Sequence, residues 1–151
     1  MKFMHKIYEV VRIKQIVQDI TDELMNLKIN SPHDAHKIVT HMIGDEAREV
    51  FLVICLNHKH QITAVHRCFT GTINASIASP REVFMTALLN NATAIIIAHN
   101  HPSLELQPSP EDLSTTRRLK EAGMIMGIEL LDHLIVNAKG DYISLRERGY
   151  F

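Results

Sequence analysis

The sequence has no excess of charge of either sign. Its 151 residues include 16 basic and 17 acidic side chains, for a net charge of −1. This balance excludes the broad positive field of many nucleic-acid-binding proteins, so a nucleic-acid partner has no support from charge. The sequence also lacks an apolar run long enough to span a bilayer, and it begins with no signal-peptide core. We therefore expect a cytoplasmic protein with no membrane partner.

Cysteine is scarce, and the two cysteines are Cys55 and Cys68. Neither stands at a spacing typical of metal ligation, and both fall in or beside apolar runs. Reduced thiols are therefore expected rather than a disulfide or a zinc–thiolate site. The sequence also contains no His-x-Glu and no Cys-x-x-Cys. A nucleobase deaminase needs both patterns, so that class of enzyme is excluded.

The pattern of apolar residues predicts a single α/β domain. The hydrophobic share of 46% and the charged share of 22% are ordinary for a soluble globular protein of this size. Strand-like and helix-like segments are mixed along the chain, which favours a mixed central β-sheet flanked by helices. Predicted strands cover residues 49–56, 61–69, 94–99, 128–136 and 142–145. Three helices are predicted: one starts at Pro32, one starts at Pro80, and one covers residues 110–122. Gly44 is expected to end the first helix and Gly123 the last.

Two histidines follow the apolar run at residues 94–98. Alternate side chains of a strand share a face, so His99 and His101 should project the same way, with Cα atoms about 6.5–7 Å apart. Asn100 then points to the opposite face, and Pro102 ends the strand because it has no backbone N–H. The spacing therefore predicts two imidazoles that can close on one metal ion.

A carboxylate can complete this site. Residues 109–112, Ser-Pro-Glu-Asp, have the pattern of a helix start, with serine as the N-cap and proline in the first turn. If the chain folds back after the loop, Asp112 becomes a third ligand. Two histidines and one carboxylate leave a tetrahedral zinc ion one open position, as in catalytic zinc sites, where a bound water becomes a nucleophile. The same ligand set also suits Fe(II).

Each half of this pattern recurs elsewhere in the chain. Residues 31–34 and 79–82 have the same Ser-Pro-x-acid form without a nearby histidine pair, so Ser109 and Asp112 alone would indicate only a helix cap. Residues 58–60 repeat His-x-His, but they lie between two apolar runs with no carboxylate placed to join them. We interpret them as a solvated turn. The position of the histidine pair before a helix start is what favours a metal site.

Hydrolysis at such a metal needs a base. Glu49 opens a predicted strand and could be held at a sheet end beside the metal, although spacing alone fits an exposed charge at least as well. Glu46 and Glu82 are competing candidates. The Ser109 hydroxyl could donate to the oxyanion that forms when a carbonyl is attacked.

Together these residues resemble the JAMM motif of the MPN/JAB metalloproteases, which reads Glu49, then His99-x-His101, seven residues, and Ser109-x-x-Asp112. Further segments resemble the RadC-like branch of this group: residues 71–74, 80–83, 99–103, 131–136 and 144–147. The resemblance implies the MPN/JAB fold, with its cytidine-deaminase-like layering. It also implies Zn²⁺ as the cofactor, held by His99, His101 and Asp112. Glu49 would be the general acid/base, and Ser109 would stabilise the tetrahedral intermediate.

The function implied by the resemblance is a zinc-dependent hydrolase that cleaves a peptide or isopeptide bond in a peptide or protein substrate. The alternative is an accessory protein that binds or scaffolds in DNA repair or recombination, suggested by the historical label of RadC relatives. The complete ligand set argues against an inert scaffold. We assign residues 1–31 to an N-terminal extension packed on the domain and residues 32–151 to the RadC-like JAB/MPN domain. The oligomeric state, including a homodimer, stays open.

Two departures from the family pattern affect these expectations. The chain has Leu104-Glu105-Leu106 where family members usually read Gly-Asp-Pro, so the loop that borders the site should differ in shape. We expect no counterpart of the N-terminal helical region of longer RadC proteins, and nothing is carried over from it. Asp132 and His133 could support a ligand histidine. A histidine satisfied by its local contacts at a strand start fits the sequence equally well.

Overall fold

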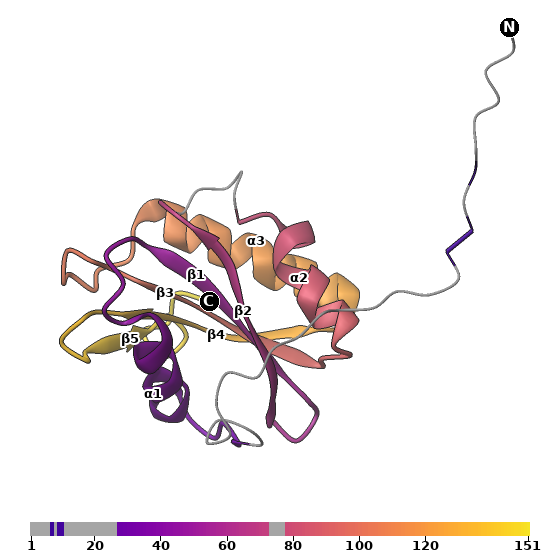
Figure 1. Ribbon diagram of the computed structural model, residues 1–151, viewed down its shortest axis with the longest axis horizontal. Helices are drawn as coiled ribbons and strands as arrows, with labels where there is room; N and C mark the ends of the chain where they lie inside the picture. The colour runs from indigo at the N-terminus through magenta and orange to yellow at the C-terminus, as the bar shows by residue number, and fades with distance from the viewer. Residues whose placement is uncertain (1–6, 8, 11–26, 73–77) are drawn as a thin grey trace, which may run out of the picture.

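The computed structural model describes residues 7, 9–10, 27–72 and 78–151. Within these residues the chain forms a five-stranded mixed sheet and three helices, which confirms the predicted fold class (Figure 1). The strands are β1 (Val50–Leu56), β2 (Ile62–Thr70), β3 (Ala94–Asn100), β4 (Glu129–Val136) and β5 (Tyr142–Ser144). The helices are α1 (Pro32–Ile43), α2 (Pro80–Leu89) and α3 (Pro110–Met126).

The sheet separates two apolar layers. Its strand order is β2-β1-β3-β4-β5, with β3 and β4 parallel and the other neighbours antiparallel. Helix α1 packs on one face, and α2 and α3 pack on the other. The central strands β1 and β3 are buried along their whole length. Covered faces on both sides explain why these strands have continuous apolar sequences rather than alternating ones.

The three Ser-Pro patterns all begin helices, as predicted. Ser31, Ser79 and Ser109 each accept a hydrogen bond from the backbone N–H three residues later. Only the cap of α3 is a complete capping box among them, because the Asp112 side chain also accepts from the Ser109 backbone N–H. This reciprocal pair fixes both the start of α3 and the direction of one carboxylate.

The predicted end of α3 at Gly123 is wrong. The helix continues to Met126, and its left-handed C-cap is Gly127, with φ of 71°. Gly123 instead lies within α3, at the point where Ile128 passes beside the helix. A Cβ atom there would stand 2.3 Å from the backbone oxygen of Ile128. Glycine is required at this position for close packing of the chain rather than for helix termination.

We expect Gly123→Ala to lower the free energy of unfolding by about 3 kcal/mol, because the new methyl group would stand 2.3 Å from a backbone oxygen rather than from the end of a flexible side chain. Gly127→Ala is the matched control, since nothing lies within 4 Å of its Cβ position. There the cost is the left-handed conformation alone, about 1 kcal/mol. Urea denaturation measures both. An equal or smaller loss in Gly123→Ala would contradict the packing role.

Other features of the described residues bear on the sequence predictions. Both cysteines are free, and burial raises the pKa of Cys55 to about 12 and, together with Glu82, that of Cys68 to about 11. Among the described residues no helix is long and apolar enough to cross a bilayer.

Most of residues 1–31 lie outside the description, although Ile29 joins the core beside α1. The packed N-terminal extension therefore stays a prediction.

Candidate metal centre

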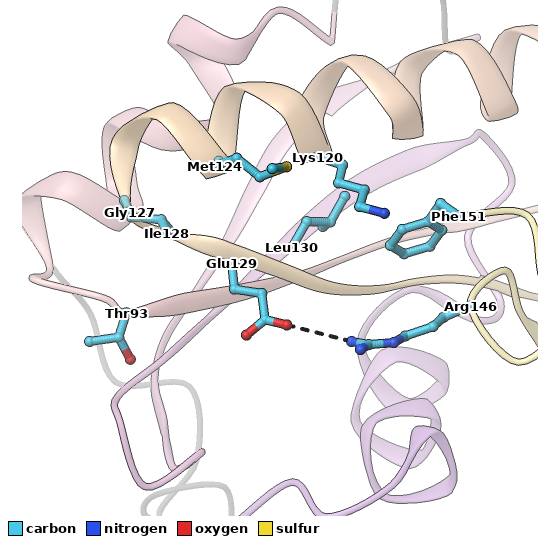
Figure 2. A pocket seen from close by; sticks show the side chains of 10 residues that line it. Thr93, Lys120, Met124, Gly127, Ile128, Glu129, Leu130, Arg146 and Phe151 are labelled. Carbon is cyan, nitrogen blue, oxygen red and sulfur yellow. Dashed lines mark ion pairs between the residues drawn. The ribbon is translucent and has the colours of Figure 1, made fainter.

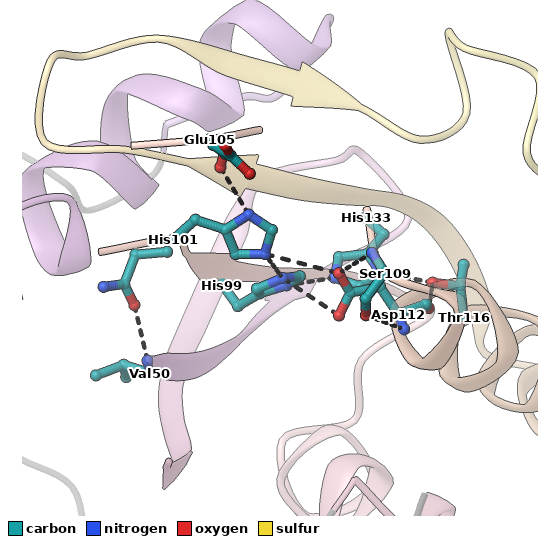
Figure 3. Close-up of polar contacts among 9 residues, drawn as sticks. Val50, His99, His101, Glu105, Ser109, Asp112, Thr116 and His133 are labelled. Atoms are coloured by element: carbon teal, nitrogen blue, oxygen red, sulfur yellow. Dashed lines mark hydrogen bonds and ion pairs between the residues drawn. The ribbon is translucent and has the colours of Figure 1, made fainter. Parts of the chain in front are cut away.

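The two histidines predicted to share a face do so. His99 and His101 lie at the end of β3 and point toward the start of α3 (Figure 3). Their Nε2 atoms are 2.9 Å apart. His99 is fully buried and His101 is partly buried. A backbone hydrogen bond of 2.8 Å from His101 N–H to the carbonyl of Val136 keeps this end of the chain against β4.

The capping box of α3 brings Asp112 to the same place. Its backbone N–H donates to Ser109 Oγ at 3.0 Å, and its Oδ2 accepts from the Ser109 backbone N–H at 2.8 Å. The carboxylate oxygens also lie 3.5 Å from His99 Nε2 and 3.6 Å from His101 Nε2. One potential ligand atom from each of the three residues therefore lies within 4.8 Å of the others.

These donor atoms fit a tetrahedral metal ion. His101 Nδ1 is 2.7 Å from the carbonyl oxygen of Glu105, which can only accept. The ring proton of a neutral His101 is therefore on Nδ1, and its Nε2 offers a lone pair to the cluster. Two nitrogens on one tetrahedral zinc, each about 2.0–2.1 Å from the ion, stand about 3.3 Å apart. The observed separation of 2.9 Å needs only a small opening to admit the ion.

The cluster favours positive charge. Burial alone would lower the pKa of His101, but its contacts with the Asp112 carboxylate and the Glu105 carbonyl outweigh this and raise it. Burial alone would raise the pKa of Asp112, yet the imidazoles of His101 and His99 hold it far below its usual range. A metal cation therefore competes with protonation of His101 more strongly than it would at a free histidine.

Metal affinity should therefore depend on pH. Below the raised pKa of His101 the metal competes with one proton, so affinity should fall about tenfold for each pH unit. Above that pKa it should level off. The free energy of unfolding of the metal-free protein should change in the opposite direction. The contribution of the His101–Asp112 pair should be lost as pH rises through the raised pKa of His101. Competition titrations between about pH 5 and pH 8 measure the first effect. A flat profile would contradict it.

Glu49 lies beside the cluster but not among its ligand atoms. The strand register pairs Phe51 with His99, and Glu49 stands two residues before Phe51 in the chain. Glu49 is partly buried, and its charge is one of the influences that raise the pKa of His101. Of its competitors, Glu46 makes an exposed ion pair of 3.1 Å with Arg67, and Glu82 lies in the first turn of α2.

Asn100 holds the segment that carries Glu49, a role that sequence reasoning did not predict. Its Oδ1 accepts from the Val50 backbone N–H at 2.7 Å. Its Nδ2 donates to the carbonyls of Glu46 at 3.1 Å and Arg48 at 3.0 Å. The strand therefore turns two imidazoles toward Asp112 and the intervening amide toward the segment before β1. The signal in the sequence is an amide at the end of a strand that is otherwise apolar and buried.

Comparison with known proteins now places this site in a family. A model of the RadC-like JAB domain matches residues 29–150. The chain belongs to the RadC-like JAB family. It is 46% identical over 129 residues to a UPF0758 protein of Shouchella clausii, covering 85% of this chain and 56% of that protein. It is 44% identical over 146 residues to a UPF0758 protein of Listeria innocua, covering 97% and 64%.

A UPF0758 protein of Staphylococcus aureus is 46% identical over 127 residues, covering 83% of this chain and 54% of that protein. The resemblance seen in the sequence is therefore confirmed. The chain spans between 54% and 64% of the length of these curated relatives. What a whole RadC-family protein does consequently stays a matter for proposal.

The structure separates the roles of Asp132 and His133 in this RadC-like JAB domain. His133 is fully buried, and its Nε2 is 2.8 Å from Nδ1 of His99. Burial lowers its pKa far below the usual value, which favours the neutral ring. Asp132 instead accepts hydrogen bonds from the backbone of His133 and Arg146 and from Ser144 Oγ. His133 contacts His99, whereas Asp132 joins β4 to β5.

The loop that departs from the family pattern keeps a glycine-like backbone. Leu104 has φ of 70°, the left-handed region that glycine adopts without strain. Its backbone N–H donates to the His101 carbonyl at 3.1 Å, and its carbonyl accepts from Asn137 Nδ2 at 2.9 Å. Leucine therefore occupies a conformation that is more typical of glycine. Its side chain is 41% exposed, and the difference in loop shape from relatives stays a prediction.

A separate hollow of about 460 Å³ lies at the opposite end of the parallel pair β3–β4 (Figure 2). Its charged side chains have partners within the hollow. Arg146 Nη1 is 3.8 Å from Glu129 Oε1, and Lys120 Nζ lies 5.6 Å from the centre of the Phe151 ring. None of the residues that line it is His99, His101 or Asp112. The candidate site of the RadC-like JAB domain is therefore the cluster at the end of β3.

Proposed function

We propose that this RadC-like JAB domain is a zinc-dependent hydrolase of the cytoplasm that cleaves a peptide or isopeptide bond in a peptide or protein substrate. The observation that carries the proposal is the convergence of His99 Nε2, His101 Nε2 and the Asp112 carboxylate within 4.8 Å. Two imidazoles and one carboxylate hold zinc while leaving a fourth position open, which is the arrangement of catalytic rather than structural zinc sites.

The residues around the cluster have the properties that amide hydrolysis needs. When bound, the zinc would polarise the substrate carbonyl and acidify a water molecule. Glu49 would accept the proton that the attacking water loses and return it to the leaving amine. Ser109 Oγ already accepts the backbone N–H of Asp112, so its own hydroxyl proton is free to donate to the developing oxyanion.

Metal analysis and substrate profiling together test this proposal. Protein purified without added metal should contain about one zinc per chain, and iron in its place would favour the oxygen chemistry open to the same ligands. The zinc-loaded protein is then incubated with a defined peptide mixture and with isopeptide-linked conjugates, and cleavage is followed by mass spectrometry. Cleavage should stop on chelation and return with zinc. Hydrolysis that chelation leaves unchanged would refute the proposed function.

A further inference from the structure

The buried residues His99 and Asp112 of the cluster are also joined by a chain of three hydrogen bonds through His133 and Thr116, which we call the circuit (Figure 3). His99 Nδ1 lies 2.8 Å from His133 Nε2, and His133 Nδ1 lies 2.6 Å from Thr116 Oγ1. Thr116 Oγ1 in turn lies 2.6 Å from the carbonyl oxygen of Asp112. Three of these four residues are fully or almost fully buried, and Asp112 is 3% exposed.

The direction of every bond in this circuit follows from its end. The Asp112 carbonyl can only accept, so the single hydroxyl proton of Thr116 donates to it. Thr116 Oγ1 must then accept, and the proton between it and His133 belongs to Nδ1 of His133. His133 is fully buried, and burial favours the neutral ring, which has only one proton. Its Nε2 therefore accepts from Nδ1–H of His99. His99 is thereby left with its lone pair on Nε2, facing His101 and Asp112.

We propose that His133 and Thr116 are positioning residues that fix the tautomer of His99 and so form the metal site before the metal arrives. This inference rests on the proposed function, since it assigns the circuit a purpose in metal binding. A neutral imidazole not held in this way carries its proton on either nitrogen, and the Nε2–H form cannot bind metal at that atom. Partners that orient metal-ligating histidines typically affect metal affinity by about 10- to 100-fold.

The fold builds this circuit from two separate features. Thr116 follows Asp112 by one helical turn, which places its hydroxyl against the Asp112 carbonyl. On the sheet, the pairing of β3 with β4 shifts by one residue between Ile95 and Ile96. After this shift His133 pairs with Ile97, whose side chain lies in the layer beneath α2 and α3. Without the shift His133 would face α1.

A neighbouring threonine offers a matched control. Thr115 is 2% exposed and Thr116 is 1% exposed. Thr115 Oγ1 has no hydrogen-bond partner among the described residues, whereas Thr116 Oγ1 is part of the circuit. Replacement by valine therefore makes the same change of a buried hydroxyl to a methyl group at adjacent positions, and it breaks the circuit at only one of them.

The test combines zinc affinity with nitrogen-15 NMR of the histidine rings in the full chain. In the metal-free wild type, long-range spectra should show the Nδ1–H tautomer for both His99 and His133. Thr116→Val should bind zinc about tenfold more weakly than wild type, while Thr115→Val should stay within about twofold. Thr116→Ser keeps the hydroxyl and should restore affinity, which separates the circuit from general damage to the core.

Different outcomes overturn different claims. If wild type binds zinc and Thr116→Val binds it as tightly as Thr115→Val, the positioning role is refuted and the proposed function is untouched. An Nε2–H tautomer of His99 in metal-free wild type refutes the circuit directly, whatever the variants do. If wild type shows the expected tautomers but binds no zinc, the proposed function fails, and the role of the circuit in metal binding fails with it.

Discussion

Replacing His99 with alanine should remove the metal, whereas the same replacement at His58 should leave about one zinc per chain. His99 is fully buried and offers Nε2 to the cluster, so its loss leaves only two ligand residues. Two ligands hold zinc far less tightly than three, because the remaining positions must be filled by water. Metal content of dialysed protein, measured by inductively coupled plasma mass spectrometry, gives the result directly.

His58 is a stringent control because it belongs to the other His-x-His of the chain. Residues 58–60 are exposed and form the turn between β1 and β2, as the sequence predicted. Within the described residues, the acidic, histidine and cysteine side chains that lie close enough to hold a metal are His99, His101 and Asp112. Neither His58 nor His60 is among them. Equal zinc in the two variants would show that the metal is bound elsewhere, and it would remove the basis of the proposed hydrolase.

Glu49→Gln should reduce hydrolysis by about 10³-fold while leaving the zinc content unchanged. Glutamine keeps the shape of the side chain but cannot accept the proton that the proposed reaction must move. The carboxylate of Glu49 is not among the clustered ligand atoms, so its loss should leave metal binding intact. Zinc content and cleavage of the same substrate are measured on one preparation, which separates loss of chemistry from loss of metal.

Glu46→Gln is the corresponding control. Glu46 precedes Glu49 on the same segment, but its carboxylate is exposed and paired with Arg67. Its replacement should leave hydrolysis within about twofold of wild type, as expected when a surface ion pair is lost. A Glu49→Gln protein as active as wild type would rule out Glu49 as the base and would return Glu82 to consideration.

Local patterns in the sequence predicted most of the elements. Each Ser-Pro-x-acid pattern begins a helix because the serine side chain and the proline ring act within one turn of the chain. Continuous apolar runs predicted β1 and β3, which are buried on both faces. The end of α3 was the exception. Glycine is a residue type that often ends helices. Gly123 is needed instead because Ile128 passes close to it, and this contact depends on packing between two elements.

The sequence by itself determined that His99 and His101 share a face and that Asp112 begins a helix, since both depend on backbone geometry over a few residues. Only the tertiary structure decided that these groups meet. It also decided that Asn100 holds the segment of Glu49 and that a one-residue shift in pairing turns His133 toward His99. The contacts of Asn100 with the Glu49 segment and of His133 with His99 join residues 34 to 54 positions apart. Strand register and helix packing set them, and no local pattern specifies either.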